Sequence, residues 1–304
     1  MRYYDIPGTT LHVSAVGLGC MRVASKSWQE VDALVRASLD AGVTFFDHAD
    51  IYGAGACESV FGEVLRHDPS LRDRMVLQTK TCIRIGTCYE SSHDYIVKSV
   101  DEALGRLHTD HLDSLLIHRP DALMDPEEVA WAFSDLKHAG KVDWFGVSNM
   151  NPGQIRLIQK YTGEPIVFNQ LQFSPAHAWM VDEGIHVNMD DEYACVRDGG
   201  VLDFCRLNDI TVQCWSILAD SKREQFLGNP AHAKLDEVLR RLAEAHGVTP
   251  TAIVVAWILR HPAHMMPLAG TTSPEHLREL AQGADVELTH DEWYEVYLAE
   301  HPLP

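Results

Sequence analysis

Thr44-Phe45-Phe46-Asp47 and Val76-Leu77-Gln78-Thr79-Lys80 are short, largely apolar runs that each end on a charged side chain. Leu115-Leu116-Ile117-His118 and Trp144-Phe145-Gly146-Val147-Ser148-Asn149 follow the same pattern and end on a histidine and on a Ser-Asn pair. Each run is too short for a helix and is followed by polar or turn residues, so each predicts a buried strand. The carboxyl ends of the strands in a parallel α/β barrel face one mouth, where these polar side chains are expected to converge.

The rest of the chain alternates between strand-like and helix-like segments. The remaining predicted barrel strands cover residues 16–19, 166–170, 210–216 and 265–269. Strands separated by single helices imply a parallel sheet with right-handed crossovers, and eight such segments imply closure. We therefore predict an α/β protein with one domain over residues 1–304, a (β/α)8 TIM barrel.

Additions to the basic barrel are expected at both ends of the chain. A hairpin over residues 3–13, with Pro7 and Gly8 in its turn, is expected to cover the bottom of the barrel. Helical patterns at 234–246, 250–260 and 291–299 bring the number of predicted helices two above the eight that the barrel needs. Two long segments, 175–198 and 217–230, are expected to form loops that cover a ligand at the mouth.

Composition excludes several classes of function. The net charge is −19, from 44 acidic and 25 basic residues, which argues against a nucleic-acid partner because phosphate neutralisation needs clustered Lys and Arg. No apolar run of membrane-spanning length occurs, and no apolar segment of a signal peptide follows the first residues. Seven cysteines without a C-x-x-C spacing are expected to be reduced thiols. A cytoplasmic protein without a membrane partner is expected.

Four reactive side chains, Asp47, Tyr52, Lys80 and His118, fall at or just beyond predicted strand ends. Each also has a simpler interpretation: Asp47 as a turn cap, Lys80 as a solvated lysine, His118 as a core histidine and Tyr52 as a packing residue. The four simpler interpretations are less convincing when they are taken together, because buried strands seldom end on unpaired charges. We predict an Asp47–Lys80 ion pair with Tyr52 and His118 beside it.

This group of residues suits the reduction of a carbonyl. A carbonyl that accepts a hydride develops negative charge on its oxygen, which then needs a proton donor and an orienting hydrogen-bond donor. The pKa of a free tyrosine is about 10, and a nearby Lys80 ammonium is expected to lower it. Tyr52 is the predicted acid, Asp47 keeps Lys80 charged and in place, and His118 orients the carbonyl.

A metal-dependent hydrolase is the alternative from the residues alone. Asp47, His48, Asp50 and His118 offer oxygen and nitrogen ligands at strand ends. A lysine in the middle of them would repel a metal ion, and His48 and Asp50 are expected to point away from Asp47. No metal is predicted.

The same residues resemble the motifs of the aldo-keto reductase superfamily. The resemblance lies in seven stretches: Asp47-His48-Ala49-Asp50-Ile51-Tyr52-Gly53, Gln78-Thr79-Lys80, Leu115-Leu116-Ile117-His118-Arg119-Pro120-Asp121, Gly146-Val147-Ser148-Asn149, Phe168-Asn169-Gln170, Cys214-Trp215-Ser216-Ile217-Leu218 and Pro267-Leu268-Ala269-Gly270-Thr271-Thr272. They occur in the family's order and span nearly the whole chain. The segment 182–190 is similar to that of a bacterial subgroup of predicted oxidoreductases.

The resemblance implies an NADPH-dependent reductase of aldehydes or ketones on a (β/α)8 barrel, with Tyr52, Asp47, Lys80 and His118 as catalytic residues. It implies that Ser148, Asn149 and Gln170 hold the nicotinamide carboxamide and that Trp215 stacks on the ring. The remaining implied cofactor contacts are Ser216, Leu218, Gly270, Thr271, Thr272 and His276. A regulatory protein that keeps fold and cofactor but turns over little is a further alternative.

His276 departs from the family pattern, because many members have an arginine at this position. A neutral histidine is a weaker clamp for a 2′-phosphate than a bidentate arginine, so NADH is a possible cofactor beside NADPH.

The substrate is expected to be a small carbonyl compound. The candidate pocket residues are Met21, Trp28, Ile51, Cys82 and Arg119. Trp28 fits the start of an outer helix equally well. Arg119 is expected to pair with a nearby acid such as Asp121 in preference to a substrate anion, so no acidic substrate is predicted.

Overall fold

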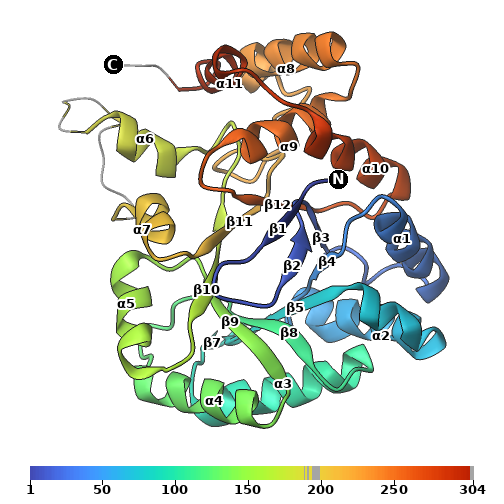
Figure 1. The fold of residues 1–304 in the computed structure, drawn as a ribbon, viewed down its shortest axis with the longest axis vertical. Helices are drawn as coiled ribbons and strands as arrows, with labels where there is room; N and C mark the ends of the chain where they lie inside the picture. Colours follow the sequence, from blue (N-terminus) through green and yellow to red (C-terminus); the bar gives the residue numbers. More distant parts are fainter. Residues whose placement is uncertain (188, 190–191, 194–198, 302–304) are drawn as a thin grey trace.

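Eight parallel strands close into a barrel in the computed structural model, which describes residues 1–187, 189, 192–193 and 199–301 (Figure 1). The strands are β3 (Gly17–Gly19), β4 (Phe45–Asp47), β5 (Val76–Thr81), β8 (Leu112–Ile117), β9 (Val142–Ser148), β10 (Ile166–Gln172), β11 (Thr211–Trp215) and β12 (Met266–Ala269). Each pairs with the next along the chain, and β12 pairs with β3 to close the ring. The predicted (β/α)8 barrel is confirmed.

Helices surround the barrel. The barrel helices are α1 (Trp28–Asp40), α2 (Ala56–His67), α3 (His93–Leu107), α4 (Pro126–His138), α5 (Pro152–Tyr161), α7 (Val201–Leu207), α9 (Pro250–Arg260) and α10 (Pro274–Gln282). Their starts follow local chemistry: Ser27 and Asn151 each close a capping box at the first turn of α1 and α5. The two additional helices, α8 (Ala233–His246) and α11 (His290–Tyr297), lie together at the upper edge of Figure 1.

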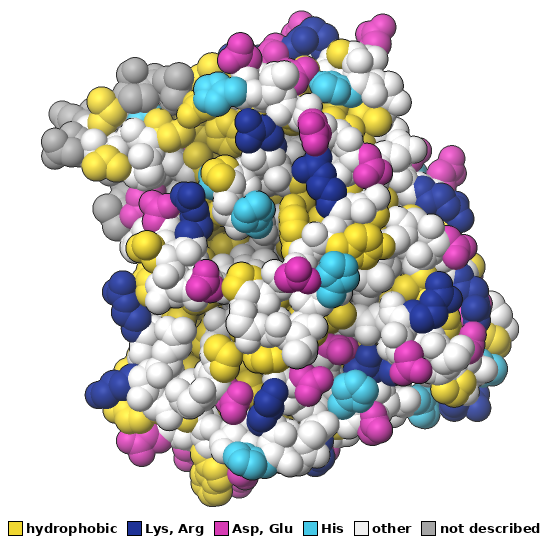
Figure 2. Space-filling view, viewed as in Figure 1, with side chains coloured by type: hydrophobic (Ala, Val, Ile, Leu, Met, Phe, Trp, Pro, Cys, Tyr) yellow, Lys and Arg dark blue, Asp and Glu magenta, His cyan; other side chains and the backbone are white. Residues whose placement is uncertain are grey.

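The N-terminal hairpin closes one end of the barrel. Strands β1 (Tyr3–Asp5) and β2 (His12–Ser14) pair antiparallel. Ile6, Leu11 and Val13 form one apolar cluster with inward side chains of the barrel strands, among them Phe45 and Phe168. Because these side chains belong to the amino-terminal parts of the strands, the hairpin leaves the carboxyl ends free. On the face seen in Figure 2, acidic and basic side chains are interspersed, without a broad basic area.

Two elements in the long connections were not predicted. A short ribbon of β6 (Ile83–Arg84) and β7 (Cys88–Tyr89) follows β5, and α6 (Trp179–Ile185) lies within the 175–198 segment, part of which falls outside the described residues. Short 3-10 helices are η1 (Tyr52–Gly55), η2 (Pro69–Arg74), η3 (Pro230–His232) and η4 (Gly283–Asp285). Within the described residues, no single helix is long and apolar enough to cross a membrane. The segments Pro230–His246 and Pro250–Arg260 meet that test only as a pair bent by 91°.

Candidate active site

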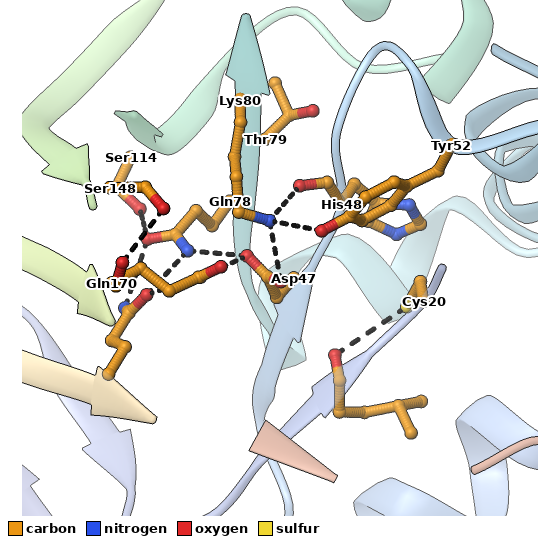
Figure 3. A network of polar contacts seen from close by, with 12 residues as sticks. Cys20, Asp47, His48, Tyr52, Gln78, Thr79, Lys80, Ser114, Ser148 and Gln170 are labelled. Carbon is orange, nitrogen blue, oxygen red and sulfur yellow. Dashed lines mark hydrogen bonds and ion pairs between the residues drawn. The ribbon is translucent and has the colours of Figure 1, made fainter. Parts of the chain in front are cut away.

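Lys80 is the centre of the site at the carboxyl ends of the strands. Its ammonium donates to Asp47 Oδ2 at 2.8 Å, to the backbone oxygen of His48 at 2.7 Å and to Tyr52 Oη at 3.0 Å (Figure 3). Lys80 is fully buried and Asp47 is 3% exposed. Burial alone lowers the pKa of Lys80, but the Asp47 charge raises it, with a net rise above the ordinary lysine value. The predicted ion pair is present, and Lys80 is held as an ammonium.

Glutamine side chains in the barrel interior also hold Asp47. Its second oxygen, Oδ1, accepts from Gln78 Nε2 at 2.7 Å and from Gln170 Nε2 at 3.1 Å. Both amides also donate to Gln213 Oε1, and Gln213 Nε2 returns a bond to Gln78 Oε1. All three glutamines are buried inside the barrel. Two donors on one oxygen and Lys80 on the other compensate the Asp47 carboxylate for the loss of water.

Sequence reasoning assigned no role to Gln78 and Gln213. A signal was available, because Gln78 lies two residues before Lys80 and Gln213 two residues before Trp215. Side chains two apart in a strand point to the same face. Each glutamine therefore lies on the inward face, one layer below a mouth residue.

Tyr52 reaches Lys80 from the turn after β4. Gly53, Ala54 and Gly55 have φ angles of 58°, 53° and 89°, and this left-handed stretch connects the tyrosine to the start of α2 at Ala56. Burial raises the pKa of the Tyr52 hydroxyl, and the opposing Lys80 charge does not offset it. The expected lowering of this pKa is therefore wrong for the site without bound ligands: Lys80 acts in the expected direction, but desolvation is stronger. Tyr52 carries its proton at neutral pH.

His118 follows β8 directly and faces Tyr52. The two rings meet edge to face, with centroids 5.9 Å apart. Burial, followed by the charges of Lys80 and Arg119, lowers the pKa of His118 to about 2. The imidazole is therefore neutral at physiological pH, with one ring N–H that can donate to a carbonyl oxygen.

Three strands turn at the mouth through a left-handed residue that is not glycine. Cys82, Asn149 and Ser216 have φ angles of 81°, 57° and 53°, and each comes directly after the last residue of β5, β9 or β11. This backbone conformation is disfavoured for residues with a Cβ, and such strain clusters at functional sites.

Ser148 and Asn149, at the end of β9, lie beside Gln170 of the neighbouring strand β10. Ser148 Oγ donates to the Gln170 backbone oxygen and accepts from Asn149 Nδ2. Gln170 Nε2 is engaged by Asp47 and Gln213, so Gln170 Oε1 is the side-chain atom left to accept from a ligand. Trp215, at the end of β11, has a buried indole nitrogen without a hydrogen-bond partner among the described residues. These groups suit a planar amide and an aromatic ring, as a nicotinamide presents.

The predicted phosphate segment lies where β12 passes into α10. Gly270, Thr271 and Thr272 connect the two elements, and Ser273 caps the helix by accepting from the backbone N–H of His276. The His276 side chain is exposed. A helix N-terminus with free backbone donors attracts anions, so the segment fits a phosphate group.

Comparison with known proteins decides the family. The model of the Aldo/keto reductase family matches residues 15–298. The chain belongs to the aldo/keto reductase family. As a member of this family it is an NAD(P)H-dependent oxidoreductase, as the sequence predicted.

Relatives of this aldo/keto reductase share nearly its full length. It is 34% identical over 315 residues to a protein named uncharacterized oxidoreductase YcsN from Bacillus subtilis (strain 168), with 95% of each chain covered. It is 35% identical over 298 residues to a 6-dehydroglucose reductase of Novosphingobium aromaticivorans, with 94% of this chain and 91% of that protein covered. A crystal structure of an aldo/keto reductase from Klebsiella pneumoniae with NADP and acetate shares the fold, at a TM-score of 0.72 and 24% identity, over 96% of this chain and 93% of that chain.

The five residues expected at the substrate pocket of the reductase lie in different environments in the structure. The Trp28 ring stacks on His67 of α2, with centroids 3.9 Å apart, which supports the alternative that it packs between two outer helices. Cys82 follows β5 directly at the mouth and its side chain is fully buried, so its contact with a substrate stays a prediction. Met21 is exposed, and Ile51 and Arg119 are half-buried close to Tyr52 or His118 in the chain. These three stay candidates for substrate contact.

A second buried polar network lies behind the site. Glu58 is fully buried; it accepts from Thr79 Oγ1 at 2.5 Å and pairs with Arg106 at 2.8 Å. Sequence reasoning missed this network. Burial, and after it the charge of Glu58, raises the pKa of the neighbouring Asp50 to about 7. Its Oδ1 has no hydrogen-bond partner among the described residues.

We expect Asp50 to make the stability of the reductase depend on pH. The pKa is about 7 in the folded chain and about 4 in the unfolded chain, so the folded state retains the proton longer. The unfolding free energy therefore falls as pH rises from about 4 to about 7, on the order of 1.4 kcal/mol per pH unit in this window. Asp50→Asn cannot ionise, so its stability relative to the wild type should increase over the same window.

Urea denaturation between pH 4.5 and 8 measures this difference. Asp73→Asn, on an exposed carboxyl of η2, is the matched control and should follow the wild type at every pH. A constant difference between Asp50→Asn and the wild type would show that folding does not raise the pKa of Asp50.

Proposed function

We propose that this aldo/keto reductase reduces an aldehyde or ketone to an alcohol, with Tyr52 as the proton donor. The observation that carries the proposal is the single Lys80 ammonium, which contacts both the Asp47 carboxylate and the Tyr52 hydroxyl at a buried strand end. The relative named 6-dehydroglucose reductase is a carbonyl reductase by its name, and we carry this reaction type over to the present chain. A bound NADPH or NADH supplies the hydride.

The residues divide the proton chemistry between them. Tyr52 transfers its hydroxyl proton to the carbonyl oxygen as negative charge develops there. Lys80 then lies 3.0 Å from the phenolate oxygen that forms and stabilises its charge. Asp47, held by two glutamines, keeps Lys80 in place. The neutral His118 donates a hydrogen bond to the same carbonyl oxygen and sets its orientation.

The charge of Lys80, which opposes the effect of burial on the pKa of the Tyr52 hydroxyl, is what favours proton transfer. The raised pKa of Tyr52 keeps it protonated before reaction, and the ammonium at 3.0 Å favours the phenolate only once the proton has left. An interaction that is stronger after proton transfer than before it accelerates the reaction. The low dielectric around the fully buried Lys80 enlarges the effect.

The alternatives from the sequence find less support. Both oxygens of Asp47 already accept from Lys80 or glutamine, and the buried His48 ring packs edge-on against Phe61. His111, Asp113 and Asp143 have ligand atoms within 4.8 Å of one another, but they lie at the amino ends of β8 and β9, and Arg72 pairs with Asp113. No observation favours a regulatory protein over an enzyme.

Cofactor titration tests the proposal and the His276 question together. We expect both NADPH and NADH to quench tryptophan fluorescence, with Kd values within about tenfold of each other, because a neutral histidine is a weak 2′-phosphate ligand. His276→Arg should tighten NADPH binding by about tenfold and leave NADH unchanged. Carbonyl-dependent oxidation of the reduced cofactor at 340 nm then measures turnover. Failure of the wild type to bind either cofactor would refute the proposal.

A further inference from the structure

Two arginines converge on Trp215 at the mouth. The Cζ atom of Arg119 lies 5.9 Å from the Trp215 ring centroid, and that of Arg223 lies 5.6 Å from it. Arg119 follows His118 directly in the chain, and Arg223 belongs to the long loop after β11. Two residues far apart in the chain thus place their guanidinium groups near the same ring at the end of β11.

Neither guanidinium is neutralised. Within the part of the chain that the structure describes, neither forms an ion pair with a carboxylate or donates a side-chain hydrogen bond. The expected partner of Arg119, Asp121, is engaged elsewhere: its Oδ2 accepts from Ser91, and its Oδ1 accepts from the backbone of Leu123. The expectation of a local Arg119 pair is therefore wrong.

Two unpaired cations in one place are unfavourable. Burial, and then the charge of Arg223, lower the pKa of Arg119, which shows that the two charges repel each other. Contact with the Trp215 ring offsets only part of this, since a cation–π contact is worth about 0.5–2 kcal/mol. The chain has 44 acidic residues, yet none among those that the structure describes forms an ion pair with either arginine. An anion between the two groups would remove the repulsion and could accept from both planar forks.

The position of the pair ties such an anion to the reacting carbonyl. The charge of Arg119 acts on His118 and on Tyr52, the two residues that face the carbonyl oxygen in the proposed reaction. We propose that Arg119 and Arg223 bind a carboxylate carried by the substrate, so that this reductase acts on aldehyde acids or keto acids. This inference rests on the proposed function and names the substrate class of the same site.

A matched substrate pair isolates the charge. 4-Carboxybenzaldehyde and methyl 4-formylbenzoate present the same aldehyde on the same ring, with and without the negative charge. The wild type should show a kcat/KM at least about tenfold higher for the acid, and Arg119→Met and Arg223→Met should each remove most of this preference, mainly through KM. The ratio of the two kcat/KM values, acid over ester, is therefore the quantity to compare between the wild type and each variant. Arg240→Met, on an exposed arginine of α8 that pairs with Asp236, is the control.

The other source of an anion at this mouth is the phosphate of the cofactor. The Kd of NADPH, measured by fluorescence in the same variants, separates the two sources. An unchanged Kd together with a lost acid preference supports the substrate carboxylate. A Kd that rises while the acid preference persists overturns it and assigns the arginines to the cofactor. Equal losses for acid and ester also overturn it.

A binding measurement keeps the inference separate from catalysis. Calorimetric titration of the enzyme–NADP⁺ complex with 4-(hydroxymethyl)benzoate and with its methyl ester needs no turnover. If no carbonyl is reduced but the acid binds in preference and Arg119→Met abolishes that preference, the carboxylate site stands while the proposed reaction fails. If carbonyls are reduced and the wild type does not distinguish acid from ester, the reaction stands and the carboxylate site fails.

Discussion

Replacing Tyr52 by Phe should lower kcat for carbonyl reduction on the order of a thousandfold, while the Kd of the cofactor stays unchanged. The substitution removes one hydroxyl and keeps the ring, so its edge-to-face contact with His118 is preserved. General-acid catalysis by a positioned side chain contributes roughly 10²–10⁴-fold, and the lost phenolate–ammonium contact adds to this.

The loss should appear in kcat and in kcat/KM alike, because the proton is transferred only in the transition state. Initial rates of cofactor oxidation with a saturating aldehyde measure it, and cofactor titration and thermal unfolding check that the variant is intact. Tyr3→Phe is the matched control. Tyr3 lies on the hairpin at the far end of the barrel, and the substitution removes a hydroxyl that donates to the backbone oxygen of Gly42. A Tyr52→Phe enzyme with wild-type activity would contradict the mechanism.

Strand ends carried most of what the sequence could predict. A charged residue such as Asp47 or Lys80 after an apolar run indicates where the buried strand ends. It also indicates an ion-pair partner nearby, because an unpaired charge there would be too unfavourable to keep. The parallel barrel then requires the four catalytic candidates to meet at one mouth. The hairpin was equally readable, since Pro7 and Gly8 leave few other conformations.

The features of the site that could not be predicted from the sequence depend on partners from distant segments of the chain. Gln78 and Gln213 are 135 residues apart, and nothing in either strand specifies that the other amide lies opposite. Glu58 reads as an ordinary helix-start acid until Arg106 from α3 is seen beside it. The sign of the pKa shift of Tyr52 was missed for a related reason: the charge of Lys80 is visible in the sequence, whereas the extent of burial is not.

The position of Arg119 shows the same limit with a functional consequence. Asp121, two residues away, is the natural partner by proximity in the chain. In the structure its carboxylate satisfies Ser91 and the turn at Leu123, which leaves Arg119 to face Arg223 from a remote loop. A local pairing rule thus predicted an Arg119–Asp121 pair that is absent from the described residues.

The Asp47–Lys80 pair should show that stability and catalysis can be separated in this site. Lys80→Met alone leaves Asp47 buried with only the two glutamine donors, and breaking a buried pair in this way costs about 3–5 kcal/mol of unfolding free energy. Asp47→Asn alone leaves the Lys80 ammonium buried beside two neutral acceptors, with a similar cost. The double variant Asp47→Asn/Lys80→Met removes both charges and should recover most of the lost stability, because a buried pair replaced as a whole is often nearly neutral.

Activity should not recover with stability. All three variants lack either the ammonium beside Tyr52 or the carboxylate that holds it, so each should lose at least about a hundredfold in kcat. Urea denaturation at pH 7 gives the coupling energy of the cycle, and cofactor oxidation gives the rates. Lys26→Met, which breaks the exposed pair with Glu30, should change stability by less than about 1 kcal/mol. Restored turnover in the double variant would mean that the pair serves folding alone. An unfolding free energy of Lys80→Met equal to that of the wild type would mean that Asp47 can take up a proton inside the barrel. Its hydrogen bonds with Gln78 and Gln170 would then be kept.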